Sequence, residues 1–262
     1  MTPLAVAAAL AGTTALGFSL RFHWWRPRRR GVPVLMYHQI APHRPGSALN
    51  AWRLRPEDFE RQLDHLARRG LAGVTLRDLL DAPPRPGDRR VVLTFDDGYD
   101  NVRTAALPLL RARGFSATVF VVSGKLGGAN DWDGEMPGDA LLSEDGVREL
   151  AAAGLEVGSH GATHRVLQEL PDAELAAETR GSRERLERIT GAAVVSFCYP
   201  YGACDARTAG AVREAGFRAA TVIRGGLVPD LEDPFRLRRV AVRGTKGLFD
   251  FRLALTRGRS TF

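Results

Sequence analysis

The sequence predicts an α/β fold built on a parallel sheet. Along residues 32–262, short apolar runs of strand length alternate with segments that carry apolar residues at helical spacing. Most of the helical segments end at a glycine directly before the next apolar run, as helix C-termini often do. This alternation is typical of βα units, and it fits either a (β/α) barrel or a doubly wound sheet.

The expected elements follow one another along the chain. Strands are expected at 33–40, 91–95, 116–122, 155–160, 194–200 and 217–223. Helices are expected at 59–70, 106–114, 147–154, 174–191 and 207–216. In the first helix, Phe59, Leu63 and Leu66 recur at helical spacing before Gly70. The segment at 174–191 is predicted to be one long amphipathic helix.

Composition and charge exclude several classes of protein. The chain has 262 residues, of which 44% are hydrophobic and 26% charged, so it is not a disordered, collagen-like or multi-span membrane protein. The net charge is +7, but the basic residues gather at 21–30 and 236–262, and the region between them is acidic. A nucleic-acid-binding protein would spread its basic surface over the working domain, so nucleic acid is not an expected partner.

The N-terminal segment predicts a membrane anchor. Residues 4–20 carry no charge, and Trp24, Trp25 and an arginine cluster follow. As a helix the uncharged run is about 26 Å long, which is the short end of what crosses a bilayer. We therefore expect an anchor or signal-like helix at 1–25, a basic linker at 26–31 and a folded domain at 32–262. A cleavable signal peptide is the alternative, although its positive charge would precede the apolar run.

Two adjacent carboxylates follow the strand expected at 91–95. Asp96 and Asp97, in TFDDG, lie at its C-terminal end, where the active sites of α/β barrels gather. Consecutive strand side chains point to opposite faces, so both reach one site only if the chain bends there. An acidic turn without a catalytic role is the alternative, because Asp and Gly are common in turns.

Two histidines follow the strand expected at 155–160. His160 and His164 are four residues apart in SHGATH, and on a helical turn this spacing places both imidazoles within reach of one metal ion. Together with one aspartate they would make three protein ligands and leave positions open for water, as in catalytic metal sites. Two unrelated loop histidines are the alternative.

A third strand end carries SFCYPYG at 196–202, whose turn could direct backbone N–H groups at a substrate oxygen. Taken together and in this order, the three segments resemble the signature of the NodB-type polysaccharide deacetylases, carbohydrate esterase family 4. The opening VLMYHQI and the segment GGANDWDG at 127–134 resemble the branch associated with surface polysaccharides such as poly-N-acetylglucosamine.

The resemblance implies a distorted (β/α) barrel, which would follow the N-terminal hydrophobic helix expected from residues 4–20. It also implies a metal-dependent hydrolase that removes N-acetyl groups from N-acetylhexosamine units of a polysaccharide or lipid-linked glycan. Asp97, His160 and His164 would bind a divalent metal, usually zinc, with cobalt, nickel or manganese as alternatives. Asp96 would be the general base, and the backbone N–H of Tyr201 would help to stabilise the oxyanion.

Two departures from the family pattern concern the groups around the base. The family commonly has an arginine where this chain has Cys198, and Arg238 and Arg239 are the candidate substitutes. No histidine follows His164 to act as general acid, so His38, at the end of the first expected strand, is the candidate. The expected substrate contacts are Tyr199, Pro200 and Trp132.

Other interpretations stay open at this point. The same site could cleave O-acetyl esters or small amides, or the protein could be a carbohydrate-binding protein whose site has decayed. Carbohydrate and membrane are the expected partners, and no protein partner is predicted. The family implies a cell-surface domain, whereas the positive-inside rule places it on the cytoplasmic face. An internal enzyme acting on a lipid-linked sugar would satisfy both.

Overall fold

The computed structural model describes residues 2, 12–14, 17, 30–134 and 138–258. The anchor predicted at 1–25 and the linker predicted at 26–31 therefore lie almost wholly outside the described residues. Among the residues that are described, no helix is both long and apolar enough to cross a membrane.

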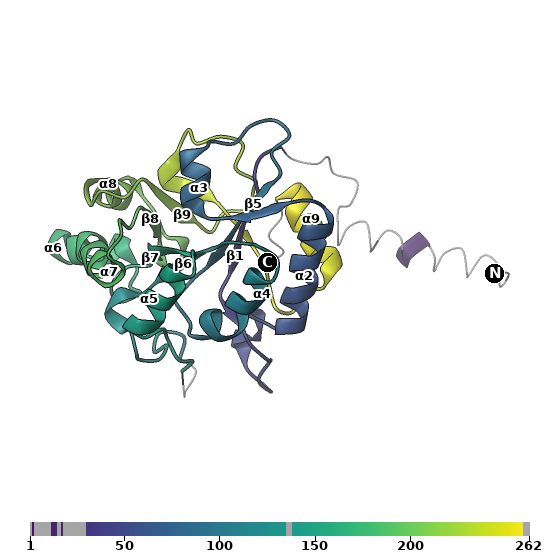
Figure 1. Ribbon diagram of the computed structural model, residues 1–262, viewed down its shortest axis with the longest axis horizontal. Coiled ribbons are helices and arrows are strands. Elements are labelled where there is room, and N and C mark those ends of the chain that lie inside the picture. The colour runs from purple at the N-terminus through teal and green to yellow at the C-terminus, as the bar shows by residue number, and fades with distance from the viewer. Residues whose placement is uncertain (1, 3–11, 15–16, 18–29, 135–137, 259–262) are drawn as a thin grey trace.

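Parallel strands form a nearly closed barrel surrounded by helices (Figure 1). Within the described ranges, one nine-stranded sheet runs in the order β10-β9-β8-β7-β6-β5-β1-β11, and β4 pairs with β5 beside β6. The strands are β1 (Val34–Tyr37), β4 (Ala72–Val74), β5 (Arg90–Phe95), β6 (Thr118–Val121), β7 (Glu156–Ser159), β8 (Ser196–Cys198), β9 (Ala219–Val222), β10 (Leu237–Arg238) and β11 (Val240–Ala241). The distorted (β/α) barrel expected from the sequence is confirmed.

A single residue crosses the seam of the barrel. The two edge strands of the sheet, β10 and β11, are consecutive in the chain and are separated only by Arg239. Because β10 pairs with β9 and β11 pairs with β1, Arg239 bridges the first and last strands of the sheet. Its side chain is 1% exposed, so it lies inside the protein although its neighbour Arg238 is exposed.

The helices cover the outside of the barrel. They are α2 (Pro56–Arg68), α3 (Leu76–Asp81), α4 (Leu107–Arg111), α5 (Glu144–Ala152), α6 (Asp172–Ala176), α7 (Ser182–Thr190), α8 (Ala206–Glu214) and α9 (Leu248–Arg257). The single helix predicted at 174–191 is wrong in one respect, because a π-helical turn, Ala177–Gly181, separates α6 from α7. The strand predicted at 33–40 is also interrupted: it breaks at His38, and β2 (Gln39–Ile40) leaves the barrel to pair with β3 (Arg53–Leu54).

The core has two apolar layers, as alternation along the strands requires. On β5, Val91, Leu93 and Phe95 belong to the large cluster that packs against the outer helices. Val92 belongs to a smaller cluster on the other face of the sheet, inside the barrel. Thr94 and Asp96 continue this inward series, so the alternation carries Asp96 into the barrel interior.

Candidate metal centre

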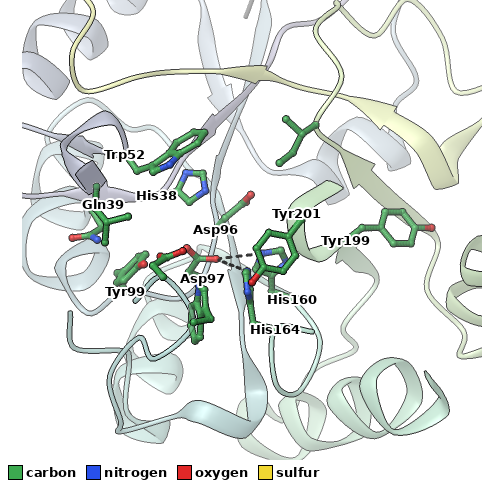
Figure 2. Close-up of a pocket in the computed structure, with 14 residues that line it drawn as sticks. His38, Gln39, Trp52, Asp96, Asp97, Tyr99, His160, His164, Tyr199 and Tyr201 are labelled. Atoms are coloured by element: carbon green, nitrogen blue, oxygen red, sulfur yellow. Dashed lines mark ion pairs between the residues drawn. The ribbon is translucent and has the colours of Figure 1, made fainter. Parts of the chain in front are cut away.

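The predicted metal ligands come together at the C-terminal ends of β5 and β7 (Figure 2). The Nε2 atoms of His160 and His164 each lie 3.3 Å from Oδ1 of Asp97. One ligand atom from each of the three residues lies within 4.8 Å of the others, and all three side chains are buried. His160 Nδ1 is 2.7 Å from the carbonyl oxygen of Cys198, which fixes the ring with Nε2 toward Asp97.

The donor set fits a divalent cation. Two imidazole nitrogens and one carboxylate oxygen are the ligands of many catalytic zinc sites. Burial by itself would raise the pKa of Asp97, but hydrogen bonds from His160 and His164 outweigh it and hold the pKa well below the ordinary carboxyl value. Asp97 is therefore ionised and available as a ligand at neutral pH. Asp96, His160 and Cys198 form a second close group, but the guanidinium of Arg239 contacts two of them and opposes another cation there.

Backbone strain gathers at this centre. Asp97, His164 and Tyr201 have φ values of 71°, 63° and 58°, and within the described ranges they are the only non-glycine residues with positive φ. This left-handed region is costly for residues with a Cβ, and such residues cluster at functional sites. The turn at Asp97 is the bend that the sequence required for two consecutive aspartates to face one site.

Asp96 is held by an arginine from the barrel seam. Arg239 Nη1 lies 2.6 Å from Oδ1 of Asp96 and Nη2 lies 2.7 Å from Oδ2, a bidentate ion pair between two buried side chains. Burial alone would raise the pKa of Asp96, but the charge and hydrogen bonds of Arg239 outweigh it and lower the pKa. Of the two arginines proposed from the sequence, the structure therefore places Arg239, not Arg238, against Asp96.

Cys198 packs against the same ion pair. Its Sγ lies 3.1 Å from Arg239 Nη2 and 3.6 Å from Asp96 Oδ2. The short thiol side chain leaves the space that the guanidinium of Arg239, from the seam of the barrel, fills. Cys198 and Cys204 are both free thiols.

His38 lines the same pocket, a cavity of about 120 Å³. It follows β1 directly, its ring lies 4.4 Å from the ring of Trp52, and its Nδ1 is buried without a hydrogen-bond partner among the described residues. Burial is the main influence on this imidazole and lowers its pKa, although Asp97 and Asp96 act in the opposite direction. The exposed His43 bonds the Arg53 carbonyl 2.9 Å away, outside the pocket lining.

Of the predicted substrate contacts, Trp132 lies at the metal centre, whereas the Tyr199 side chain points away from it. The ring of Trp132 stacks on His164 at 4.4 Å, and that of Tyr201, which is 51% exposed, meets His164 edge-on at 4.7 Å. Figure 2 shows the Tyr199 side chain pointing away from the metal centre, and its hydroxyl donates to the carbonyl of Phe235 at 3.1 Å. Both Tyr199 and Pro200 are buried, and of the two only Tyr199 is among the residues that line the pocket.

Glu178 supports the histidine loop and was not predicted from the sequence. Its carboxylate accepts hydrogen bonds from the backbone N–H groups of Ala162 and Thr163, at 2.6 and 3.0 Å, and from the Thr163 hydroxyl. These residues lie between the two candidate ligands His160 and His164. Glu178 sits in the π-helical turn, and such turns are frequent at functional sites.

Replacing Glu178 with glutamine is expected to weaken metal binding about 10- to 100-fold. Glutamine keeps an oxygen that can accept from the two backbone N–H groups, but its amide N–H donates where the Thr163 hydroxyl now donates, and the negative charge that strengthens all three hydrogen bonds is lost. We therefore expect a looser loop around His160 and His164. Competition with a chromophoric chelator measures the affinity, and Glu184→Gln, an exposed position on the following helix, is the control. An unchanged affinity in Glu178→Gln would show that the loop holds its shape without this carboxylate.

The protein is a (β/α) barrel with an Asp-His-His cluster beside an arginine-bound carboxylate, an arrangement suited to metal-assisted hydrolysis. The family model for polysaccharide deacetylase matches residues 84–220, more than half of the chain, so the protein belongs to this family. Its activity class is therefore that of a hydrolase acting on acetylated carbohydrate. The matched segment contains the three candidate ligands and Asp96, whereas His38 and Arg239 lie outside it.

Individual relatives agree with this assignment. YxkH of Bacillus subtilis is 25% identical over 214 residues, 80% of this chain and 71% of the relative. A chitin deacetylase of Colletotrichum lindemuthianum is 32% identical over 127 residues, 48% of each chain. The structure of IcaB from Ammonifex degensii has a TM-score of 0.70 and 26% identity, and covers 83% of this chain and 94% of that one.

Proposed function

We propose that this protein is a metal-dependent N-deacetylase that removes acetyl groups from N-acetylhexosamine units of a polysaccharide. The observation that carries the proposal is the meeting, in one small pocket, of the Asp97, His160 and His164 cluster with an ionised carboxylate, Asp96. Amide hydrolysis needs an electrophilic centre, a base for water and an acid for the departing amine. The pocket offers a candidate residue for each of these tasks.

Asp97, His160 and His164 would hold a divalent ion, and the nitrogen-rich donor set favours zinc. When bound, the ion would supply Lewis acidity that polarises the acetyl carbonyl and makes water easier to deprotonate. Asp96 accepts the proton of the attacking water, and Arg239 keeps Asp96 ionised and correctly oriented.

The remaining pocket residues complete the proposed reaction. The backbone N–H of Tyr201 donates to the oxyanion as the carbonyl is attacked. His38, whose Nδ1 has no partner among the described side chains and whose ring faces the same cavity, gives a proton to the leaving amine. The C–N bond then breaks and releases acetate and a free amino sugar.

An aromatic rim supports a sugar as the substrate. Trp52, Trp132 and Tyr201 line the cavity, and aromatic faces are apolar surfaces on which a pyranose ring can stack. The cavity of about 120 Å³ suits an acetamido group and part of one ring. The chitin deacetylase relative, by its name, acts on a polymer of N-acetylglucosamine, which supports the same substrate class.

The test is acetate release by the full-length protein, stripped of metal and then supplied with zinc. N-acetylglucosamine oligomers are compared with O-acetylated oligosaccharides that lack N-acetyl groups. We expect zinc-restored release from the N-acetyl oligomers. Release from the esters alone would replace the N-deacetylase with an O-deacetylase, and no release despite tight zinc binding would contradict both.

A further inference from the structure

A second, larger hollow lies at the opposite end of the barrel from the metal centre. Its volume is about 590 Å³, and Pro33, Leu71 and Arg90, which line it, stand where β1, β4 and β5 begin. The metal centre stands where such parallel strands end. On β5, Arg90 and Asp96 are separated by the length of the strand, about 20 Å.

The lining of this hollow is strongly basic. Five arginines face it with a single carboxylate, Asp88; the arginines are Arg69, Arg89, Arg90, Arg252 and Arg257. Asp88 is already paired with Arg90 at 2.5 Å, and Arg89 donates to the backbone carbonyls of Gly70 and Arg69. Backbone acceptors satisfy hydrogen bonds but cancel no charge, so the hollow keeps a net positive charge.

Two of these arginines are available to an anion. Arg69 and Arg252 are exposed, and their side chains make no hydrogen bond or ion pair with the described part of the chain. Both lie beside the contact between α2 and α9, where the ring of His65 meets that of Phe251 at 6.3 Å. Burial lowers the pKa of His65, and the charges of Arg252, Arg69 and Arg68 lower it further, which reflects how closely the cations gather.

An exposed aromatic residue borders the same hollow. Within the described ranges, Tyr201 and Phe249 are the only large hydrophobic residues that are exposed, at 51% and 41%. Tyr201 belongs to the rim of the metal pocket. Phe249 lines the basic hollow, and an exposed aromatic beside clustered arginines is typical of surfaces that sit at a membrane interface.

The chain enters the folded domain at this hollow. Gly31 lines it, and the uncharged run at 4–20 ends only a short stretch of sequence before Gly31. Fully extended, that stretch reaches at most about 40 Å. It also contains Arg26, Arg28 and Arg29, so the sequence directly before the hollow carries further positive charge.

We propose that this basic hollow docks on the surface of an anionic bilayer, where its arginines bind the phosphates of phospholipid headgroups. Docking at this end directs the metal centre away from the membrane by about the height of the barrel. The site would then face a polymer at some distance from the bilayer, not a sugar attached to a lipid at its surface. The docking surface does not depend on the proposed catalytic activity.

Hydrogen exchange of the full-length protein on vesicles tests the docking. Phosphatidylcholine vesicles are compared with vesicles that also contain about one third phosphatidylglycerol. We expect slowed exchange at 65–71 and 248–257 only on the anionic vesicles, with loss of this protection in high salt. An apolar anchor would hold the protein on both kinds of vesicle, so the difference isolates the charge of the headgroups.

Charge-reversal variants test whether the vesicles bind at this hollow or are attracted by the overall charge of the protein. Arg69→Glu with Arg252→Glu should lower the ratio of docked to undocked protein about 25-fold or more. Each basic residue near an anionic surface contributes about a five-fold factor, and the two new carboxylates add repulsion. Arg180→Glu with Arg188→Glu makes the same charge change on exposed positions of another face. Equal protection in the two double variants would overturn the proposal. Protection by soluble polyphosphate but not by anionic vesicles would also overturn it, in favour of an acidic polymer.

Discussion

His160→Ala is expected to abolish both zinc binding and acetate release. The variant loses one of three buried ligands, and it leaves Asp97 without one of the two imidazoles that hold it ionised. Metal catalysis is worth several kcal/mol of transition-state stabilisation, so activity should fall roughly a thousand-fold or more. Isothermal titration with zinc measures the first effect and an acetate assay the second.

Asp97→Ala should behave in the same way, because it removes the ligand that both histidines face. His43→Ala is the matched control, since His43 is exposed and lies outside the lining of the metal pocket. The control should bind zinc and release acetate like the unmodified protein. Acetate release at the normal rate by both ligand variants would rule out the proposed mechanism.

Arg239→Met is expected to remove most activity and to shift what remains to higher pH. Without the guanidinium, burial dominates and the pKa of Asp96 rises above its ordinary range, so the base becomes protonated at a pH where the unmodified protein is active. The acidic limb of the kcat/KM profile should therefore move upward. Removing one partner of a buried ion pair also destabilises the fold by about 3–5 kcal/mol.

Arg239→Lys and Arg238→Met separate the effects of charge, geometry and position. Lysine keeps a positive charge but not the bidentate contact, so we expect a smaller pH shift together with a reduced kcat. Arg238 is exposed, and its replacement should change neither quantity. In the unmodified protein the ionised Asp96 stabilises the fold above the ordinary carboxyl pKa, and this contribution is lost as the pH falls through its lowered value. A pH profile of Arg239→Met that superimposes on the original would contradict the role assigned to Arg239.

Local spacing explains which site residues could be predicted. Asp96 and Asp97 are adjacent, and His160 and His164 are four apart, so each pair carries a signal within one short segment. Arg239 is 143 positions from Asp96, and nothing near it marks a site. The sequence offered two neighbouring arginines. Which of the two is buried depends on how the chain crosses from β10 to β11. Strands of two residues are too short for the alternation of side chains to predict it.

The elements that were not predicted from the sequence are also short or lack a local signal. The short elements β4 and α3 carry too few residues for a clear period, and Ala72–Val74 has only one buried position. The π-helical turn that places Glu178 is invisible in a sequence that reads as a continuous amphipathic helix. Glu178 is buried, but this is seen only in the structure, so nothing in the sequence singles it out.

Titration of metal-free protein with zinc, while acetate release from N-acetylglucosamine oligomers is followed, tests the central claim most directly. One buried cluster of three ligands predicts that activity rises in proportion to added zinc and reaches its plateau at one ion for each chain. Acetate release by the fully stripped protein, or saturation with zinc without any release, would contradict the account.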